Sequence, residues 1–362
     1  YNTVDGFAFR QLGYLEWRAD STHKLTLKRE FGYAFARNAG MGEFASSYTY
    51  APLRRGFIEF KSGCQSSDYN QNNGIKPFVN SAYTLFAREN YEKLFEFHYL
   101  SLKNKIDLVN GLVLNLKLSY NKNRELDNNS DFSFFYKNSR EFTSNKPDNA
   151  NYNDEKSCNT AIAEIELEFT PFQHYKIEKG TKLAIYSKFP TFNLHYKKGI
   201  DNIALSSSDF DFLEGGINQW INMPASRSIF YTISGGGYLN KNNLPFTEFK
   251  HFNTQPLEFN VVNFNNSFTL LDFYKYSSSD YFVEGHFQYT SPYLLIKRLP
   301  FLSKQIWSES LYAKYLTNEL IKNYCETGYS INHLFLVANA GVFAGFENGK
   351  FREVGFRLGV GF

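Results

Sequence analysis

The last ten residues of the chain, 353–362, read Glu-Val-Gly-Phe-Arg-Leu-Gly-Val-Gly-Phe. Large apolar side chains stand at every second position, and glycine, glutamate or arginine stands between them. A period of two is typical of a β-strand, in which successive side chains point to opposite faces. The stretch therefore predicts a strand with one apolar face and one face of small or charged residues.

The same alternation recurs along the chain, for example at residues 112–120 and 163–169. No long window has the 3.6-residue period of a helix. We predict an all-β fold with about fourteen strands, within a range of roughly 12 to 16. The predicted strands lie near residues 3–14, 25–37, 52–63, 93–106, 111–122, 160–171, 190–199, 208–219, 225–238, 280–291, 305–316, 324–331, 336–346 and 351–362.

The length of these strands and of their connections predicts a membrane barrel. Strands of soluble sheets average about 5–6 residues, whereas a tilted membrane-spanning strand needs about 9–11. Residues 107–111 and 221–224 carry short turn signals, while 124–158 and 239–279 are long connections. Short periplasmic turns and long external loops are typical of outer-membrane barrels. We therefore expect a transmembrane antiparallel β-barrel in a bacterial outer membrane, with both termini in the periplasm.

The polar face of the strands weighs against the alternative of a soluble sandwich or propeller. Glu164, Glu166 and Glu168 share one strand face, and Lys117 and Arg357 stand on the polar faces of two other strands. Burying an unpaired ion costs several kcal/mol, whereas a wet lumen supplies water and counter-charges. We expect these five residues to line the wall of the lumen.

The composition excludes other classes of protein. The chain has 67 aromatic residues (38 Phe, 26 Tyr and 3 Trp) and a formal net charge of +3, so nothing favours a nucleic-acid partner. Its mean hydropathy is -0.43, and no apolar run approaches the length of a membrane helix. Aromatic side chains suit the lipid and headgroup layers around a barrel. Outer-membrane lipid and lipopolysaccharide are therefore expected partners.

Motifs for catalysis or metal binding are not evident. The three cysteines form no Cys-x-x-Cys pair, and the seven histidines are dispersed. We expect no metal, no cofactor and no enzymatic activity. A hydrolase that uses Glu164, Glu166 or His286 is the enzymatic alternative.

Glycines gather in the first and last predicted strands. They are Gly6 and Gly13 near the start, and Gly355, Gly359 and Gly361 just before Phe362 at the end. Glycine weakens a strand because it removes cross-strand contacts and raises the entropic cost of order. The first hypothesis is a weak seam between residues 3–14 and 351–362. The second, equally weighted, is that the glycines make room for something inside the barrel.

The connection 239–279 is long and unusually apolar. It contains Lys250, His251, Phe252 and Asn253, followed by many aromatic residues. Long connections without secondary structure are usually functional or disordered, and this one is too apolar to extend into water. We expect it to fold into the lumen or across its mouth.

Several segments resemble an uncharacterised family of Gram-negative outer-membrane barrels, whose barrel follows a carboxypeptidase-regulatory-like domain. That family is in turn distantly similar to the BamA and TamA assembly-factor superfamily. The resemblance implies one barrel domain over residues 1–362, an internal loop at 239–279, and soluble domains outside this chain. The segments are residues 1–7, 77–81, 83–86, 110–112, 188–192, 250–253, 281–287 and 299–302.

Two departures limit what the resemblance implies. The Val-Arg-Gly-Phe signature of the superfamily's inner loop is absent from 239–279, and fourteen strands are fewer than the usual sixteen. The expected function is that of a non-enzymatic barrel that assists assembly or export of envelope proteins. Other outer-membrane or periplasmic proteins would be its partners. The alternative is a passive pore for solutes, or a scaffold for surface lipoproteins.

Overall fold

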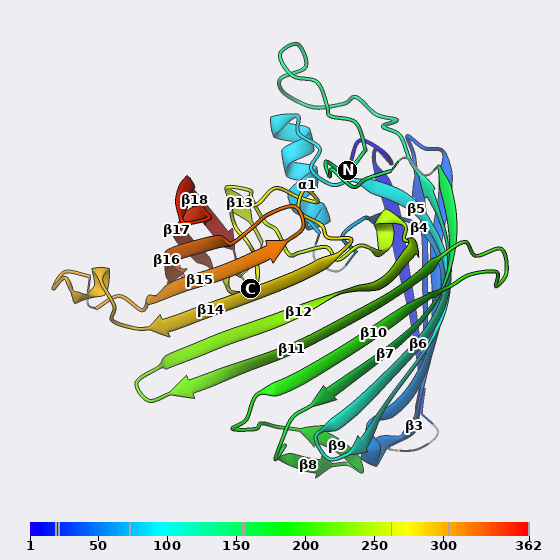
Figure 1. Ribbon diagram of the computed structural model, residues 1–362, viewed down its shortest axis with the longest axis horizontal. Helices are drawn as coiled ribbons and strands as arrows, with labels where there is room; N and C mark the ends of the chain where they lie inside the picture. Colours follow the sequence, from blue (N-terminus) through cyan, green and yellow to red (C-terminus); the bar gives the residue numbers. More distant parts are fainter. Residues whose placement is uncertain are drawn as a thin grey trace.

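The computed structural model describes residues 1–18, 20, 22–71, 74–153, 156–261, 263–302 and 304–360. These residues form one large sheet of sixteen strands and a separate two-stranded hairpin (Figure 1). The strands are β1 (Ala8–Arg18), β2 (Lys24–Ala34), β3 (Ala39–Ala51), β4 (Gly56–Asp68), β5 (Leu94–Val109), β6 (Leu112–Glu125), β7 (Ser157–Phe169), β8 (Tyr175–Glu178), β9 (Thr181–Ala184), β10 (Thr191–Ile200), β11 (Asp209–Met223), β12 (Arg227–Asn243), β13 (Phe259–Asn260), β14 (Tyr281–Ser291), β15 (Ser308–Asn318), β16 (Tyr324–Leu334), β17 (Ala338–Glu347) and β18 (Lys350–Val360).

Helical structure is confined to short pieces in the described residues. The α-helix α1 spans Pro77–Ala82 and continues into a π-helical turn at Tyr83–Ala87. Single 3₁₀ turns lie at Pro52–Arg54, Phe246–Glu248, Phe264–Asn266 and Ile296–Arg298. No helix in this part of the chain has the length and apolar character needed to cross a membrane.

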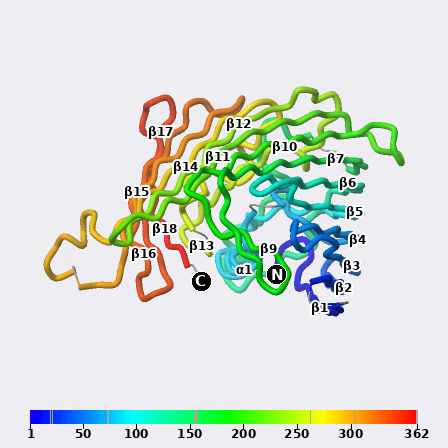
Figure 2. The backbone as a smooth tube through the Cα atoms, turned by 90° about the horizontal axis from the view of Figure 1, so that it is seen from below, coloured from blue at the N-terminus to red at the C-terminus, as the bar shows by residue number. Residues whose placement is uncertain are grey.

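The large sheet is an antiparallel meander in which each long strand pairs with the next. The hairpin β8–β9 is inserted between β7 and β10, and the two-residue strand β13 pairs in parallel with the outer edge of β18. The sheet curls, and the segment between β12 and β14 lies on its concave side (Figure 2). The predicted all-β class is confirmed.

Strand β6 shows how the period of two sorts side chains between the two faces. Leu118 is 58% exposed on the convex face, whereas Asn115 is 6% exposed on the concave face. Residues of the same convex face on neighbouring strands are also large, apolar and exposed. They include Phe31, Phe44, Phe60, Leu102, Ile165, Leu194, Leu213, Ile233, Val283, Leu311, Val342 and Phe356.

All fourteen predicted ranges overlap a strand, and the strands not predicted are the long strand β3 and the short strands β8, β9 and β13. Residues 39–51 read Ala-Gly-Met-Gly-Glu-Phe-Ala-Ser-Ser-Tyr-Thr-Tyr-Ala, with too few large apolar residues to show a period of two. Pairing with β2 and β4 on both sides supplies the order that the side chains of β3 do not encode.

The connections divide between the two ends of the sheet as the turn signals predicted. The tight turns 110–111 and 224–226 lie at one end, here called the turn end. The long connections 126–156 and 244–280 lie at the other, the loop end. Tyr1 also lies at the loop end, where its amino group donates to Ser81 Oγ at 2.8 Å.

The expectation that both termini lie on one side is wrong for this sheet. Fifteen consecutive antiparallel strands run from β1 to β18, once the edge strand β13 is set aside. With an odd number, the first and last strands run in the same direction. Ala8 therefore lies at the loop end and Val360 at the turn end.

Candidate functional site

The most distinctive site is formed by the segment 244–280, here called the inner loop, and the concave face of the sheet. Phe252, Phe268 and Leu271 of the inner loop are 0–3% exposed. Burying one such side chain contributes about 1.5–3 kcal/mol. They pack with wall residues of five strands, namely Ile162, Phe210, Phe212, Phe282, Leu316 and Tyr324.

A second apolar cluster fixes the inner loop at the loop end. Phe246, Phe273 and Tyr274 pack there with Phe95 of β5 and with the connection 69–93. Tyr274 OH also donates to Asp68 Oδ2 at 2.8 Å and accepts from the backbone N–H of Lys93. The inner loop is therefore attached to both halves of the sheet.

A buried carboxylate anchors the middle of the inner loop to the wall. Glu326 of β16 accepts hydrogen bonds from the backbone N–H groups of Thr269 and Leu270 at 3.0–3.1 Å, and from Thr269 Oγ1 at 2.7 Å. Lys314 Nζ pairs with the same carboxylate at 2.5 Å, and neither side chain is exposed. We name this cluster the glutamate anchor.

Arg357, predicted as a lumen wall residue, belongs to the same anchor. Its side chain points to the concave side and its Nε donates to the carbonyl of Thr269 at 2.7 Å. Glu326 and Lys314 were not predicted from the sequence. Each stands alone in an alternating strand, and only the fold brings them to Thr269.

Gly355 supports the second hypothesis for the glycines. A Cβ atom at Gly355 would lie 2.6 Å from Leu270 Cδ2 of the inner loop and 2.7 Å from Arg357 Nη1. Gly355 therefore makes room for the inner loop on the face of β18. Gly6 has a different role, because its φ of +66° places it in a turn that a side chain would strain.

The four residues predicted within the inner loop have separate partners. Lys250 Nζ pairs with Glu214 at 2.7 Å and with Glu284 at 3.3 Å. Asn253 Nδ2 donates to the carbonyl of Asn266 at 2.5 Å, which folds the loop on itself. Phe252 lies in the first apolar cluster.

His251 is held as a neutral imidazole. Its Nε2 lies 3.1 Å from the carbonyl of Phe246, which can only accept, and its Nδ1 lies 2.7 Å from Ser277 Oγ. Enclosure within the protein lowers the pKa of His251 to about 3, and the charges of Lys197 and Lys250 act in the same direction.

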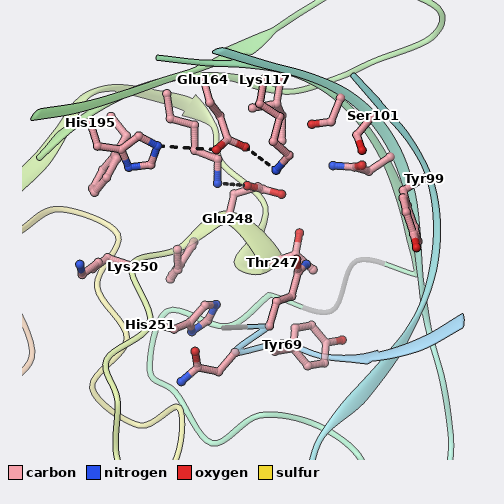
Figure 3. A pocket seen from close by; sticks show the side chains of 18 of the residues that line it. Tyr69, Tyr99, Ser101, Lys117, Glu164, His195, Thr247, Glu248, Lys250 and His251 are labelled. Carbon is pink, nitrogen blue, oxygen red and sulfur yellow. Dashed lines mark hydrogen bonds and ion pairs between the residues drawn. The ribbon is translucent and has the colours of Figure 1, made fainter. Parts of the chain in front are cut away.

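A cavity of about 400 Å³ lies between the inner loop and the wall and is lined by charged pairs. Glu164 stands between Lys117 at 2.9 Å and His195 at 3.6 Å, and Lys197 pairs with Glu248 of the inner loop (Figure 3). The charges neutralise one another, as a polar interior requires. Lys117 and Glu164 thus face the concave side of the sheet.

Glu166 and Glu168 also face the concave side, next to each other along β7. Asn115 Nδ2 donates to both carboxylates at 3.2 Å. Lys105 Nζ also lies 3.9 Å from the Glu168 carboxylate, so the contacts of the pair among the described residues are an amide and an ammonium group. This arrangement fits a polar wall better than a catalytic pair.

The predicted seam strands are not paired with each other in the described sheet. The edge of β1 has no strand beside it, and β18 pairs at its outer edge only with Phe259 and Asn260 of the inner loop. Gly6 and Gly359 lie at opposite ends, because β1 and β18 run in the same direction. Gly361 and Phe362 lie outside the described residues.

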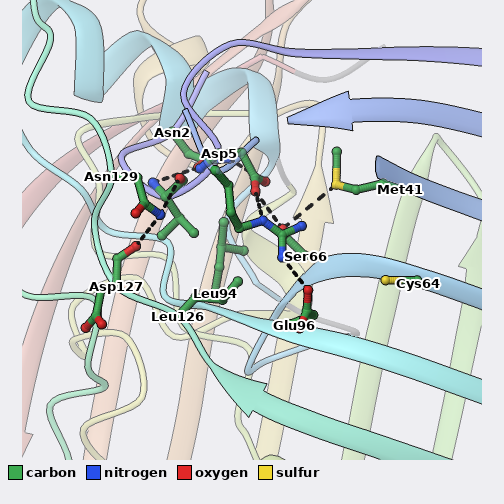
Figure 4. Close-up of polar contacts among 12 residues, drawn as sticks. Asn2, Asp5, Met41, Cys64, Ser66, Leu94, Glu96, Leu126, Asp127 and Asn129 are labelled. Carbon is green, nitrogen blue, oxygen red and sulfur yellow. Dashed lines mark hydrogen bonds and ion pairs between the residues drawn. The ribbon is translucent and has the colours of Figure 1, made fainter. Parts of the chain in front are cut away.

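One group of possible metal ligands escaped the sequence analysis, because its members come from two strands. Ligand atoms of Cys64, Glu96 and His98 lie within 4.8 Å of one another. The Glu96 carboxylate, however, already pairs with Arg37 and Arg124, each at 2.8 Å. The same network continues to Asp5 and Ser66 beneath the N-terminal segment (Figure 4). Two guanidinium groups disfavour a cation, so we assign no metal here.

The fold and site define an all-β protein with one large curled sheet, which holds an anchored loop on its concave face. Within that class, the chain belongs to the family of unknown function (DUF5686), C-terminal domain, whose family model matches residues 1–331. The resemblance to an uncharacterised family of barrels is thereby confirmed.

Comparison with solved structures gives distant likenesses. BamA from Haemophilus ducreyi lacking POTRA domains 1–3 matches with a TM-score of 0.49 and 10% identity, over 98% of this chain and 70% of that chain. Wzi is described as an outer-membrane protein involved in group 1 capsule assembly in Escherichia coli and as a carbohydrate-binding β-barrel. It matches with a TM-score of 0.33 and 9% identity, over 98% of this chain and 83% of that chain. No curated protein matches the sequence.

Proposed function

We propose that the chain is a single, non-enzymatic outer-membrane β-barrel domain that assists the assembly or export of envelope proteins. The convex face would contact lipid and lipopolysaccharide, because many large apolar side chains are exposed on it, whereas Lys117 and Glu164 pair on the concave face. Placing the tight turns in the periplasm puts Val360 on the periplasmic side and Tyr1 on the external side.

The observation that carries this proposal is the state of the two edge strands. The edge of β1 is uncovered in the described sheet, and β18 is covered by a two-residue strand of the inner loop. An exposed edge is a template for another strand. Because β13 forms only a short parallel pair, an incoming strand of a client protein can displace it from β18.

The experiment locks β13 onto β18. Phe259 and Leu358 are direct partners across the two strands, and the spacing of neighbouring strands suits a disulfide. Both would be replaced by cysteine in a chain whose three native cysteines are serine. In a strain that depends on this protein, we expect the oxidised pair to lower the levels of other outer-membrane proteins several-fold. Reduction should restore them.

The matched control uses the same position in β18. A pair at Ala340 and Leu358 joins β18 to β17, its permanent neighbour in the sheet, and leaves the outer edge free. This control should leave outer-membrane protein levels unchanged. Unchanged levels with the Phe259–Leu358 crosslink fully formed would rule out the role of this edge.

A passive pore is the second candidate, and the charged cavity of about 400 Å³ favours it. A pore and an assembly factor differ in conductance. In planar bilayers, the complete protein should be silent if the inner loop blocks the lumen, and deletion of 244–280 should open it. Steady conductance by the complete protein would favour the pore.

A further inference from the structure

A second cavity, of about 660 Å³, lies at the turn end of the concave face, and we call it the turn-end cup. The strand ends of β11, β12 and β14 to β17 form its wall, and it is bordered by Pro292, Lys297, Ile306 and Trp307 of the connection between β14 and β15 and by the inner-loop turn Phe264–Asn266. None of the residues that line the turn-end cup belongs to the glutamate anchor or lines the charged cavity.

Aromatic rings form part of the lining. Trp220 is 52% exposed, lies in a tilted arrangement with its ring centroid 5.4 Å from that of Phe230, and donates its indole N–H to Asn222. Trp307 and Tyr312 line the same cup. Two of the three tryptophans in the chain therefore border one cavity.

Neutral amides and hydroxyls of the lining, together with the buried hydroxyls of Ser310 and Ser330 behind it, form a hydrogen-bond network. Gln288 Nε2 donates to Thr290 Oγ1 at 3.0 Å and to Ser310 Oγ at 3.1 Å. Asn332 Nδ2 donates to the same Ser310 hydroxyl at 2.7 Å, and Ser330 Oγ donates to Asn332 Oδ1 at 2.7 Å. Such groups can both donate and accept.

The cup differs from the charged cavity in its lack of acidic groups. Lys297 is the one Lys, Arg, Asp or Glu side chain among its described lining residues. Its amine already donates to the carbonyl of Trp307 at 2.7 Å and lies 4.8 Å from the ring centroid of Tyr293. The described lining therefore has no carboxylate for a cationic ligand, and its one ammonium group already has a carbonyl and a ring as partners.

One acceptor in this network lacks a donor. Gln288 Oε1 is buried and has no hydrogen-bond partner among the described residues. An unsatisfied buried acceptor costs about 1–3 kcal/mol, so its persistence in a polar cavity calls for a donor. A ligand hydroxyl is a donor of suitable strength.

We propose that the turn-end cup binds a short, neutral oligosaccharide. Sugar rings present aliphatic C–H faces, which pack on the electron-rich faces of indole rings, and hydroxyls that match the amide and hydroxyl network. The volume lies within the usual range of about 300–1,000 Å³ for ligand cavities. This inference uses the cup alone and holds whether or not the barrel assembles other proteins.

The three tryptophans permit a direct test with the purified complete protein. Neutral trisaccharides (maltotriose, cellotriose, mannotriose and chitotriose) would be titrated to millimolar concentration while tryptophan emission is recorded. We expect at least one of them to shift the emission. The shift should persist in Trp17→Phe, because Trp17 lies on β1 at the far edge of the sheet, and should vanish in the double variant Trp220→Phe/Trp307→Phe.

Isothermal titration calorimetry measures sugar binding directly and does not depend on tryptophan fluorescence. Gln288→Leu and Trp220→Ala should each weaken the binding of the same sugar about tenfold. Trp17→Ala should leave it unchanged, and heat-modifiability on gels verifies that each variant is folded. The proposal fails if no neutral sugar binds, if binding survives the double variant, or if trigalacturonic acid or trialanine binds equally well.

Discussion

Glu326 carries a fully buried carboxylate surrounded by donors from the inner loop and the wall. Besides Thr269 and Leu270, Lys314 Nζ and Tyr324 OH contact it, the latter at 3.1 Å. Backbone N–H groups supply part of this shell, so the carboxylate fixes the path of the inner loop and not only one side chain. The glutamate anchor therefore couples the loop to β16.

Glu326→Ala should destabilise the protein by about 3–5 kcal/mol, because it leaves the buried ammonium group of Lys314 without a counter-charge. Urea unfolding of the detergent-solubilised protein measures this change. Glu166→Ala is the matched control, since Glu166 has a single amide contact to Asn115, and it should change stability by no more than about 0.5 kcal/mol. Equal effects of the two variants would contradict the anchor.

His251 predicts that acid loosens the inner loop. Its pKa is lowered from an ordinary value near 6.5 to about 3 in the docked loop, mainly by burial. Between these two values a released imidazole binds a proton and the docked one does not. Stability conferred by docking is therefore complete above about pH 6.5 and falls as the pH decreases, by up to about 1.4 kcal/mol per pH unit.

Limited proteolysis of the inner loop across pH 7 to 4 would measure this effect. Cleavage within 244–280 should increase as the pH falls, and His251→Gln should flatten the profile. His333→Gln, at the turn end, is the control and should keep the profile of the natural chain. A profile that is the same with and without His251 would mean that another group titrates.

At the scale of elements, the sequence predicted strands wherever large apolar residues alternate with polar ones. Strand β6 is an example, because Leu118 and Asn115 fall on the faces that the alternation implies. Strand β3 was missed because alanine, serine and glycine carry no such pattern. A period of two is visible in a sequence only when the two faces of a strand differ in hydrophobicity. Strand β3 lacks that difference and is ordered by its hydrogen bonds to β2 and β4.

The candidate site was only partly predictable for a related reason. The inner loop was expected from its length and apolar content, and Arg357 from its place on the polar face of the last strand. The hydrogen bond from Thr269 to Glu326 joins residues 57 positions apart, and Lys314 reaches the same carboxylate from the neighbouring strand. The register in which β15, β16 and β18 are placed in the sheet brings these residues together. The alternation of residues within one strand does not specify how that strand is aligned with its neighbours.

Gly355 distinguishes the two hypotheses for glycine in β18. If it makes room for Leu270, Gly355→Val should destabilise the protein by about 1–3 kcal/mol through overpacking. If it only weakens the strand, valine should stabilise it, because β-branched residues favour strands. Gly40→Val in β3 is the control, since a Cβ there meets no atom within 4 Å. Thermal unfolding of both variants gives the answer by the sign of the change.

At the scale of the whole molecule, fifteen antiparallel strands run from β1 to β18 once β13 is set aside, so the two ends of this run lie at opposite ends of the sheet. The expectation that both termini lie on one side agreed with fourteen predicted strands, an even number, and adding β3 reverses the direction of the two strands before it. The two edges, β1 and β18, consequently run in the same direction. Closure of this sheet therefore requires either a parallel pair or one further antiparallel strand between them, which is the place where the proposed function puts a client.

The proposed membrane location predicts that the convex face is sensitive to charge. Leu118 lies near the middle of β6 and is 58% exposed, so in a water-soluble protein Leu118→Arg would be nearly neutral. If the face meets lipid, arginine near the bilayer midplane should cost about 2–4 kcal/mol. Reversible urea unfolding from lipid vesicles measures the difference.

The control for that experiment is Phe335→Arg, in the turn between β16 and β17, where the side chain is 91% exposed beyond the ends of the strands. It should change stability by less than about 0.5 kcal/mol in the same vesicles, because water or headgroups surround the turn. The comparison isolates depth in the bilayer, since both variants place the same charge on an exposed position. Equal costs at residues 118 and 335 would place both in one solvent, and the membrane-spanning assignment of the sheet would then have to be abandoned.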